Sequence, residues 1–484
     1  MGAVGWGWGE TGVVAAVGRR PTLMRACSSS SMVLEGFYGI VDCCCEHESQ
    51  TLVVSPALPV VIFWWIDRKG WAAVEVVHER CAGIDISKAD AKVCIRVQGR
   101  GRRRTGQVVR TWAATTAQIL ALRDCLEQER VTLVVMEATG DYWKPFYYLF
   151  EDAGFETVLA NPRRVRAIPG RKSDVCDAVW LADLGAHGLV VASMVPPQPI
   201  RELRDLTRTR TAITRERARE YQRLEKLLED AGIKLSTVAS SLTLVSVRQM
   251  LEAMIAGERD PRVLADLARG QLRSKRAALN EALLGRFTEH HAFLARLHLD
   301  LIDRHTAAIE ELTARIEVVI EPFRAFHTLI CTIPGVSTIV ADVIVAETGA
   351  DMSRFPTAQH LASWAGTAPG SNESAGKVKS TQVRPGSPHL KGALGIAAKG
   401  AARSKGTFLS AKYQRIARRR GAARALVAVE RTLLTTIWHM GTTGEVYTDL
   451  RADYHHRRDP NRTKRHAIAQ LQALGYTVTL QEAS

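Results

Sequence analysis

Paired cysteines, long apolar runs and, over one stretch, acidic residues are scarce in this sequence of 484 residues. The nine cysteines form no Cys-x-x-Cys pair and no Cys/His cluster with ligand spacing, which argues against structural zinc. Their scatter is typical of a protein in a reducing cytosol. The longest apolar run, residues 52–66, is too short for a membrane helix and contains Pro56 and Pro59. The N-terminus lacks a basic n-region, so we expect no signal peptide.

Acidic residues are missing from residues 374–429, which contain thirteen Lys or Arg and no Asp or Glu. This stretch supplies most of the formal net charge of +15. Solvated surfaces normally intersperse the two signs, so a one-signed run of this length predicts a nucleic-acid-binding face. A membrane-surface segment is the alternative, but glycines and prolines interrupt any long amphipathic helix here. We expect nucleic acid as a partner and no membrane.

Residues 1–77 differ in composition from the rest of the chain. They contain five of the ten tryptophans, the run Cys43-Cys44-Cys45 and four consecutive serines, and they show no sustained helical or strand period. We interpret this segment as a non-native or disordered N-terminal extension, read from a misplaced start. A true N-terminal extension is the alternative.

Residues 78–198 predict an α/β domain. Strands are expected at residues 81–85, 91–97, 107–112, 131–137 and 156–160, with a helix before each of the last two strands and another after them. Two strands end in an acid, Asp85 and Glu137, and ligand sites in α/β sheets favour the carboxyl ends of strands. For Asp85 alone, a strand-end turn is an equally good interpretation. For Glu137 a metal ligand is favoured, because an acid at the end of a strand with five apolar residues needs a partner.

Asp174 and Asp177 are spaced i, i+3, so on a helix their carboxylates share one face. Two solvated aspartates in a first turn are the plainer interpretation. With Asp85 and Glu137 they would make four carboxylates from three segments. Two Mg²⁺ ions, about 3.5–4 Å apart, would neutralise such a group and activate phosphoryl transfer. Arg171 and Lys172 come just before the aspartate pair, where they could also bind a polyanion held by the metal.

The motifs GIDISK (83–88), MEATG (136–140) and RKSDVCDA (171–178) resemble those of the DEDD insertion-sequence transposases, family one hundred and ten in the usual count. The resemblance covers residues 80 to 440. It implies a recombinase with an RNase H-like (RuvC-like) domain, and it places the four acids on Asp85, Glu137, Asp174 and Asp177. It further implies guidance by a bridge RNA and a homo-oligomer, a dimer or tetramer, acting on DNA at element ends and target in a cytoplasmic, nucleoid-associated location.

Residues 199–326 predict a long helical or coiled-coil spacer. The apolar positions follow a heptad-like stripe, which Arg210 and Arg217 interrupt. Arginine at seam positions disfavours a dry coiled coil. We expect antiparallel helices that act as spacer and oligomer contact, with the arginines on phosphate or, as often, on a solvated face.

We expect residues 327–440 to form a mostly α-helical domain, which the resemblance implies to be the C-terminal transposase domain. Pro334 and Gly335 form a turn before an apolar helix, which is a helix-hairpin-helix-like pattern suited to a DNA phosphate, although a plain helical hairpin is an equal alternative. Residues 441–484 follow as a basic tail.

The segment from Trp364 to Lys377 predicts a small flexible loop rich in hydroxyl groups. Its serines alone would be ordinary loop residues, but the transposase resemblance implies a catalytic serine in a Ser-[Ala/Gly]-Gly-Lys context. That context places it on Ser374, with Ser371 as the second choice, as the nucleophile of a covalent phosphoserine link. Lys377 would stabilise charge, and no base is identified. The expected nucleic-acid-binding side chains are Arg171, Lys172, Lys377, Lys379, Arg384 and Lys391.

The leading hypothesis is a DNA recombinase in which a metal site and a serine cooperate to cut and rejoin an insertion element. One alternative is a RuvC-type, metal-dependent Holliday-junction nuclease without serine chemistry. Another is a non-enzymatic nucleic-acid-binding scaffold that uses the basic stretch.

Overall fold

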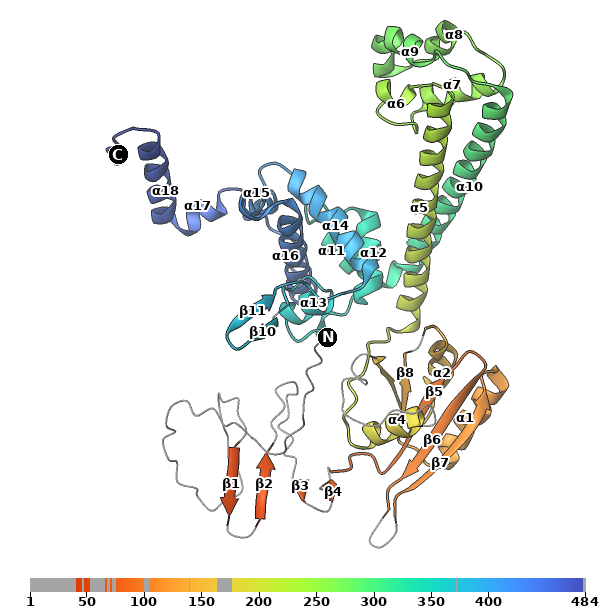
Figure 1. The fold of residues 1–484 in the computed structure, drawn as a ribbon, viewed down its shortest axis with the longest axis vertical. Coiled ribbons are helices and arrows are strands. Elements are labelled where there is room, and N and C mark those ends of the chain that lie inside the picture. The colour runs from red at the N-terminus through yellow and green to blue at the C-terminus, as the bar shows by residue number, and fades with distance from the viewer. Residues whose placement is uncertain are drawn as a thin grey trace, which may run out of the picture. The chain divides into compact units, whose positions relative to one another are not determined.

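The computed structural model describes residues 75–99, 104–138, 140–162, 176–370 and 372–481, and the backbone of four short strands before them. These strands form two antiparallel pairs, β1 (Val41–Cys45) with β2 (Glu48–Leu52) and β3 (Ile66–Asp67) with β4 (Gly70–Trp71). The remainder of the expected extension lies outside the described residues, so that interpretation stays a prediction. The chain divides into two units, Met1–Met194 and Val195–Ser484 (Figure 1).

A five-stranded mixed sheet forms the first unit. The strands are β5 (Arg80–Ile86), β6 (Asp90–Val97), β7 (Gly106–Ala113), β8 (Leu133–Glu137) and β9 (Glu156–Ala160), in the spatial order β7-β6-β5-β8-β9. The first three run antiparallel, whereas β5, β8 and β9 are parallel. Helix α1 (Thr116–Gln128) connects β7 to β8, α2 (Trp143–Phe150) connects β8 to β9, and α4 (Cys176–Ala186) follows. The expected strand order and RNase H-like fold are confirmed.

Helices cover both faces of this sheet. On β7, Gln107 donates a hydrogen bond to Asp183 of α4 at 3.0 Å, whereas Arg110 contacts Cys125 of α1 at 3.9 Å. Because side chains three residues apart on a strand point to opposite faces, α4 and α1 lie on opposite sides. Residues facing α4, such as Val135, and residues facing away from it, such as Met136, are both fully buried. The central strands are therefore core on both faces, as parallel strands usually are.

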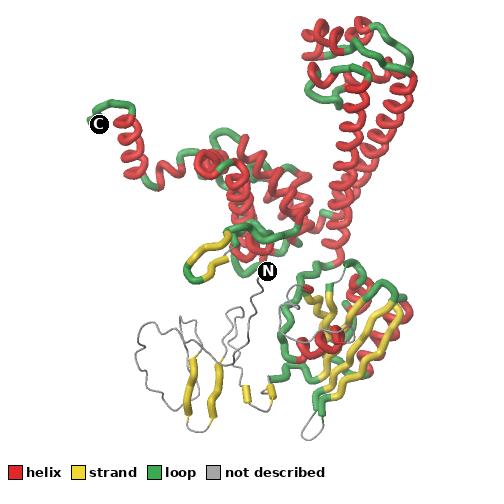
Figure 2. The backbone as a smooth tube through the Cα atoms, in the orientation of Figure 1, coloured by secondary structure: helices red, strands yellow, loops and turns green. Residues whose placement is uncertain are grey.

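Two long helices dominate the second unit, which is mostly helical (Figure 2). Helix α5 (Gln198–Asp230) packs along α10 (Glu289–Val319), and the chain reverses direction between them. The reversal contains α6 (Leu235–Val238), α7 (Val245–Ile255), α8 (Pro261–Asp266), a 3-10 helix (Gly270–Lys275) and α9 (Arg276–Ala282), which share a core with the adjoining ends of α5 and α10. The predicted long antiparallel helices are confirmed.

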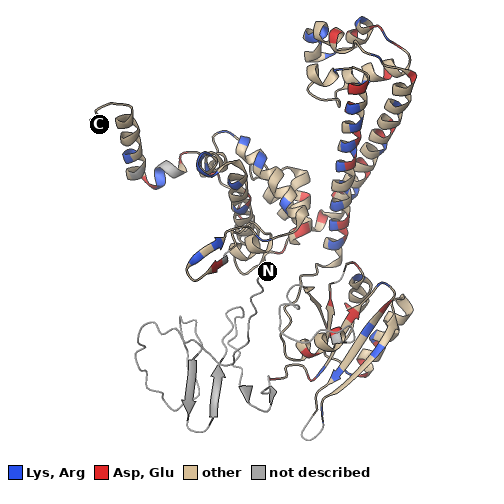
Figure 3. Cartoon of the chain, in the orientation of Figure 1, with Lys and Arg blue, Asp and Glu red and all other residues tan. Residues whose placement is uncertain are grey.

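The seam between α5 and α10 is polar where the sequence interrupts its apolar stripe. Arg217 donates to the hydroxyl of Thr306 at 3.2 Å, and buried Glu220 accepts from His298 at 2.9 Å. Lys and Arg recur along α5 (Figure 3). Hydrogen bonds across the seam satisfy these groups, so the helix pair is held without being a dry coiled coil.

A bundle of shorter helices completes the second unit. After a 3-10 helix (Glu321–Phe323) come α11 (Arg324–Cys331), α12 (Thr338–Thr348), a 3-10 helix (Met352–Arg354) and α13 (Ala358–Trp364). Strands β10 (Asn372–Ser374) and β11 (Lys377–Ser380) form a hairpin. Helices α14 (Pro388–Arg403), α15 (Phe408–Arg420) and α16 (Ala422–Thr443) follow, and then α17 (Tyr454–Arg458) and α18 (Pro460–Ala473).

The predicted helical hairpin is formed by α11 and α12, and a glycine decides how it packs. Gly335 in the connecting turn has a φ of +91°, and a Cβ there would lie 2.4 Å from the carbonyl oxygen of Ala397 on α14. Only glycine permits both this backbone conformation and this approach. No helix among the described residues is long and apolar enough to cross a membrane.

Candidate active site

Asp85 and Glu137 lie next to each other at the carboxyl ends of β5 and β8. The last paired residues on these parallel strands are Ile84 and Met136, so the two acids occupy the next position on each strand. Neighbouring strands are about 4.8 Å apart, and residues at matching positions point to the same face. Both side chains are half-buried. The sequence-predicted pair is therefore brought together by the sheet.

The face that carries these acids is the one covered by α4. A Cβ on Gly83 would lie 2.1 Å from the carbonyl oxygen of Ala178 and 2.4 Å from the amide nitrogen of Ala182. Since Asp85 is two residues after Gly83, its side chain points to the same face. The glycine lets the helix lie directly on the strand.

Helix α4 runs antiparallel to β5. The amides of Val77 and His78, just before β5, donate to the carbonyl oxygen of Ala186 at the end of α4, at 2.8 and 3.0 Å. The thiol of Cys81 donates a hydrogen bond to the carbonyl oxygen of Ala182 at 3.1 Å. The first turn of α4 therefore lies toward the end of the sheet where Asp85 and Glu137 stand.

Asp177 is the second residue of α4 and is half-buried. A carboxylate in the first turn is favoured by the helix dipole. Three predicted acids thus belong to one end of the sheet, although no three Asp, Glu, His or Cys side chains in the described part of the chain form a group able to hold a metal. Asp174, Arg171 and Lys172 lie outside the described residues. The oxygen donors that are present suit Mg²⁺, which prefers carboxylate ligands.

A further acid of α4 has a structural role. Asp183 accepts from Arg96 of β6 at 2.8 Å and from Gln107 at 3.0 Å. Arg96 is almost fully buried. Asp183 therefore neutralises a buried guanidinium and is not part of the candidate metal site.

Ser374 and Lys377 face each other across a two-residue turn in the second unit. They are paired in the β10–β11 hairpin, and the turn between them consists of Ala375 and Gly376, with φ values of +50° and +73°. Two positive φ values define a type I′ turn, which matches the twist of a hairpin. Both side chains are exposed. The predicted flexible loop is thus an ordered hairpin that presents a hydroxyl beside an ammonium group.

The other predicted cations in this region differ in their surroundings. Lys379 and Arg384 are exposed. Lys391 is half-buried, and its charge acts on the buried carboxyl of Glu430, whose pKa is raised by burial and lowered in part by Lys391. Ser371 lies outside the described residues. Lys391 is thus partly engaged inside the helical bundle.

Two buried acids of α12 form contacts that the sequence analysis missed. Asp342 accepts from Arg210 at 2.7 Å and lies 3.0 Å from Nε2 of His327, and Arg208 binds Glu347. Arg210 is thus buried in an intramolecular ion pair rather than on a solvated face. The available signal was two acids inside an otherwise apolar helix, because such acids need partners.

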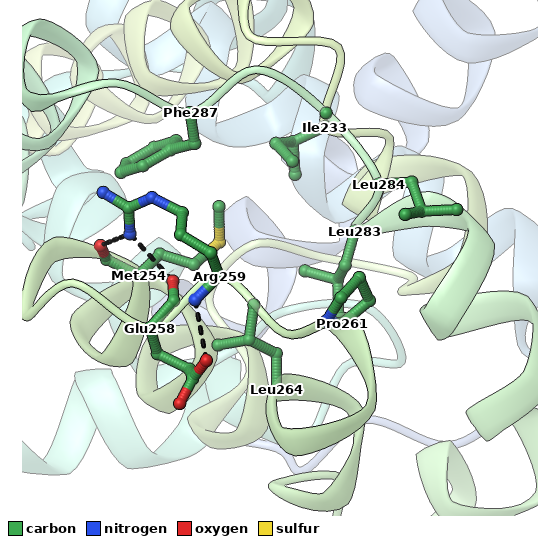
Figure 4. A pocket seen from close by; sticks show the side chains of 10 residues that line it. Ile233, Met254, Glu258, Arg259, Pro261, Leu264, Leu283, Leu284 and Phe287 are labelled. Carbon is green, nitrogen blue, oxygen red and sulfur yellow. Dashed lines mark hydrogen bonds between the residues drawn. The ribbon is translucent and has the colours of Figure 1, made fainter.

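A pocket of about 70 Å³ lies among the short helices that connect α5 and α10. Met254 and Leu264 line it, and the guanidinium of Arg259 lies 5.2 Å from the centre of the Phe287 ring (Figure 4). Arg259 also donates to the carbonyl oxygens of Met254 and Glu258. Arg259 thus holds the short helices between α5 and α10 together. None of the predicted catalytic residues lines the pocket.

Two family models match separate parts of the chain. A model for DEDD transposases of the IS110 type, described as a transposase, matches residues 82–233. A second model, described as the transposase IS116/IS110/IS902 family, matches residues 327–414. The chain belongs to this family of transposases. The first match contains Asp85, Glu137 and Asp177, and the second contains Ser374.

One solved structure that matches this transposase is Thermus thermophilus RuvC, with 14% sequence identity and a TM-score of 0.20, over 24% of this chain and 99% of that chain. No curated protein matches the sequence. A transposase is an enzyme that cuts and rejoins DNA, so the expected enzymatic activity and DNA partner are confirmed. The non-enzymatic scaffold is thereby disfavoured.

Proposed function

We propose that this transposase cuts and rejoins an insertion element with a serine nucleophile, Ser374, and a carboxylate metal site built from Asp85, Glu137, Asp174 and Asp177. The observation that carries the serine step is the pairing of Ser374 with Lys377 at an exposed hairpin turn. A hydroxyl at such a tip can reach a phosphate. The ammonium beside it can offset the negative charge that develops there.

In the proposed step, the hydroxyl oxygen of Ser374 attacks the phosphorus of a DNA phosphodiester. The new bond joins that oxygen to phosphorus, and the bond from phosphorus to one deoxyribose oxygen breaks. The serine proton is lost to a base, and the leaving oxygen takes up a proton to become a hydroxyl. A hydroxyl of another DNA end then attacks the phosphoserine and releases Ser374. One phosphodiester replaces another throughout, so rejoining needs no external energy source.

The acids supply the second part of the proposal. When bound, two Mg²⁺ ions would stabilise charge on attacking and leaving phosphate oxygens. Asp85 and Glu137 support this role because they lie side by side where two parallel strands end. Asp177, in the first turn of α4, lies toward the same end of the sheet. These carboxylates would hold the metal and position it against DNA.

We also propose a structured guide RNA as partner, a homo-oligomer, and a cytoplasmic, nucleoid-associated location. The acid-free stretch of residues 374–429 supports nucleic-acid binding. It forms the hairpin, α14, α15 and the start of α16. Lys377, Lys379, Arg384 and Lys391 belong to it, and Arg171 and Lys172 would add charge near the acids.

The domains would be residues 78–198, 199–326, 327–440 and 441–484, and α5 begins at the proposed first boundary.

The competing function is a RuvC-type junction nuclease in which the acids act alone. Denaturing electrophoresis of the protein after reaction with labelled element-end DNA separates the two. We expect a covalent protein–DNA adduct with the parent protein, none with Ser374→Ala, and no accumulation without Mg²⁺. An adduct that persists in Ser374→Ala, or cleavage with no adduct at all, would overturn the serine step. Sequencing of RNA that copurifies with the protein tests the guide.

A further inference from the structure

Glu347, near the end of α12, has a buried carboxylate that accepts three side-chain hydrogen bonds. Its side chain is only 2% exposed. Arg208 of α5 donates to both of its oxygens, from Nε to Oε1 at 2.8 Å and from a terminal nitrogen to Oε2 at 2.9 Å. Ser387 donates its hydroxyl to Oε2 at 3.1 Å. Burial alone would raise the pKa of Glu347, but Arg208 and Ser387 hold it below its usual value.

Helix α5 also binds the backbone of α12 at Glu347. Arg204 donates to the carbonyl oxygens of Ala346 and Glu347, at 2.7 and 2.6 Å. These carbonyls belong to the last turn of α12, where a cation also complements the helix dipole. Two arginines one turn apart on α5 thus fix both the side chain and the main chain of Glu347.

Ser387 links the fixed side chain of Glu347 to the next helix, α14. It is the N-cap of α14, where its hydroxyl accepts from the amide of Leu390 at 3.4 Å while donating to Glu347. It is also the residue at which the chain, returning from the Ser374 hairpin, enters α14. The orientation of the returning chain is therefore tied to Glu347.

The base of the hairpin is packed backbone against backbone. The amide of Gly370 donates to the carbonyl oxygen of Gln382 at 3.2 Å. A Cβ on Gly366 would lie 2.5 Å from the carbonyl oxygen of Arg384, and one on Gly386 would lie 2.1 Å from that of Ala365. Such approaches leave no room for the two chain segments to slide or separate without breaking contacts. Movement at Ser387 would thus reach β10 and β11.

We propose that Glu347 is a positioning residue, which holds the Ser374 hairpin in its reactive direction through Ser387 and fixes it to α5 through Arg208. This inference rests on the proposed role of Ser374 as nucleophile. Only the Glu347 end of this ion pair is buried, because the Arg208 side chain is 40% exposed, and such pairs contribute little net stability. A charged, bidentate contact here therefore has its clearest use in fixing a direction, which apolar packing does less well.

The test separates the Glu347 contact from the helix cap. Ser387→Asp keeps an N-cap residue but replaces the hydroxyl donor with a second carboxylate facing Glu347. Ser387→Thr keeps both the cap and the donor, and is the matched control. Glu347→Gln removes the charge at the other end. Each full-length variant is compared with the parent by amide hydrogen exchange at Gly370 and by the rate of covalent adduct formation at saturating DNA.

We expect Ser387→Asp and Glu347→Gln to speed exchange at Gly370 and to slow adduct formation by about 100-fold, since a displacement of about 1 Å costs that much in a positioned reaction. DNA affinity should be unchanged, and Ser387→Thr should match the parent. Unchanged exchange or an unchanged adduct rate in Ser387→Asp would overturn the positioning role. Failure of the serine step itself would look different, because the parent would then form no Ser374-dependent adduct while the exchange effect at Gly370 remained.

Discussion

Asp85 and Glu137 occupy matching positions on neighbouring parallel strands, one residue beyond the paired Ile84 and Met136. Two carboxylates held this close repel each other unless a proton or a cation lies between them. The sheet keeps the two carboxylates close together, because backbone hydrogen bonds fix the ends of β5 and β8. A divalent cation would convert the repulsion into binding energy.

Isosteric substitution of either acid should therefore abolish metal-dependent cleavage. For Asp85→Asn and Glu137→Gln we expect a loss larger than the ~10–100-fold typical of residues that only support metal ligands. Asp152→Asn, an exposed change of the same kind in the same unit, is the control. Cleavage of labelled DNA is measured over a series of Mg²⁺ concentrations. If Asp85→Asn behaved like Asp152→Asn, the metal site would have to lie elsewhere.

Lys377 should matter for chemistry, and Lys379 only for binding. Both are exposed cations on β11, but only Lys377 is paired with Ser374 across the turn. Lys377→Ala should slow adduct formation by about 100-fold at saturating DNA, the cost of losing one group that stabilises transition-state charge. Lys379→Ala should weaken DNA binding with little change in that rate. Equal rates for the two variants would show that Lys377 contributes only to general attraction of phosphate.

Much of the first unit could be predicted from the sequence. Apolar runs that end in an acid located β5 and β8, and the side-by-side placement of Asp85 and Glu137 followed from the parallel pairing of strand ends. The hairpin at Ser374 was harder to foresee, because Ala375 is an uncommon residue at a positive φ, and the usual Asn-Gly signal is absent. Arg210 was misread because its partner, Asp342, is 132 residues away along the chain, and periodicity carries no information about such pairs.

Gly83 should be irreplaceable for packing reasons alone. A side chain at this position would overlap the backbone of α4, since Ala178 and Ala182 lie within 2.4 Å of the Cβ position. We expect Gly83→Ala to lower the free energy of unfolding by about 1–3 kcal/mol or more, as overpacking does. Gly154→Ala is the control, because no atom lies within 4 Å of its Cβ position. Urea denaturation of both variants is the measurement, and equal midpoints would mean that α4 is not seated on β5.

The buried contact between His327 and Asp342 should make the second unit less stable as pH rises. The hydrogen bond and charge of Asp342 raise the pKa of His327 above its usual 6.5, although burial opposes this. A histidine whose folded pKa is raised contributes its full stabilisation below the unfolded pKa and loses it as pH rises through the folded pKa. The unfolding midpoint in urea should therefore exceed that of His327→Gln most clearly below pH 6.5, and the gap should shrink at higher pH. His466→Gln, at an exposed site on α18, controls for loss of a histidine. In an Asp342→Asn background the pH dependence of the gap should disappear, and its persistence there would show that Asp342 is not its cause.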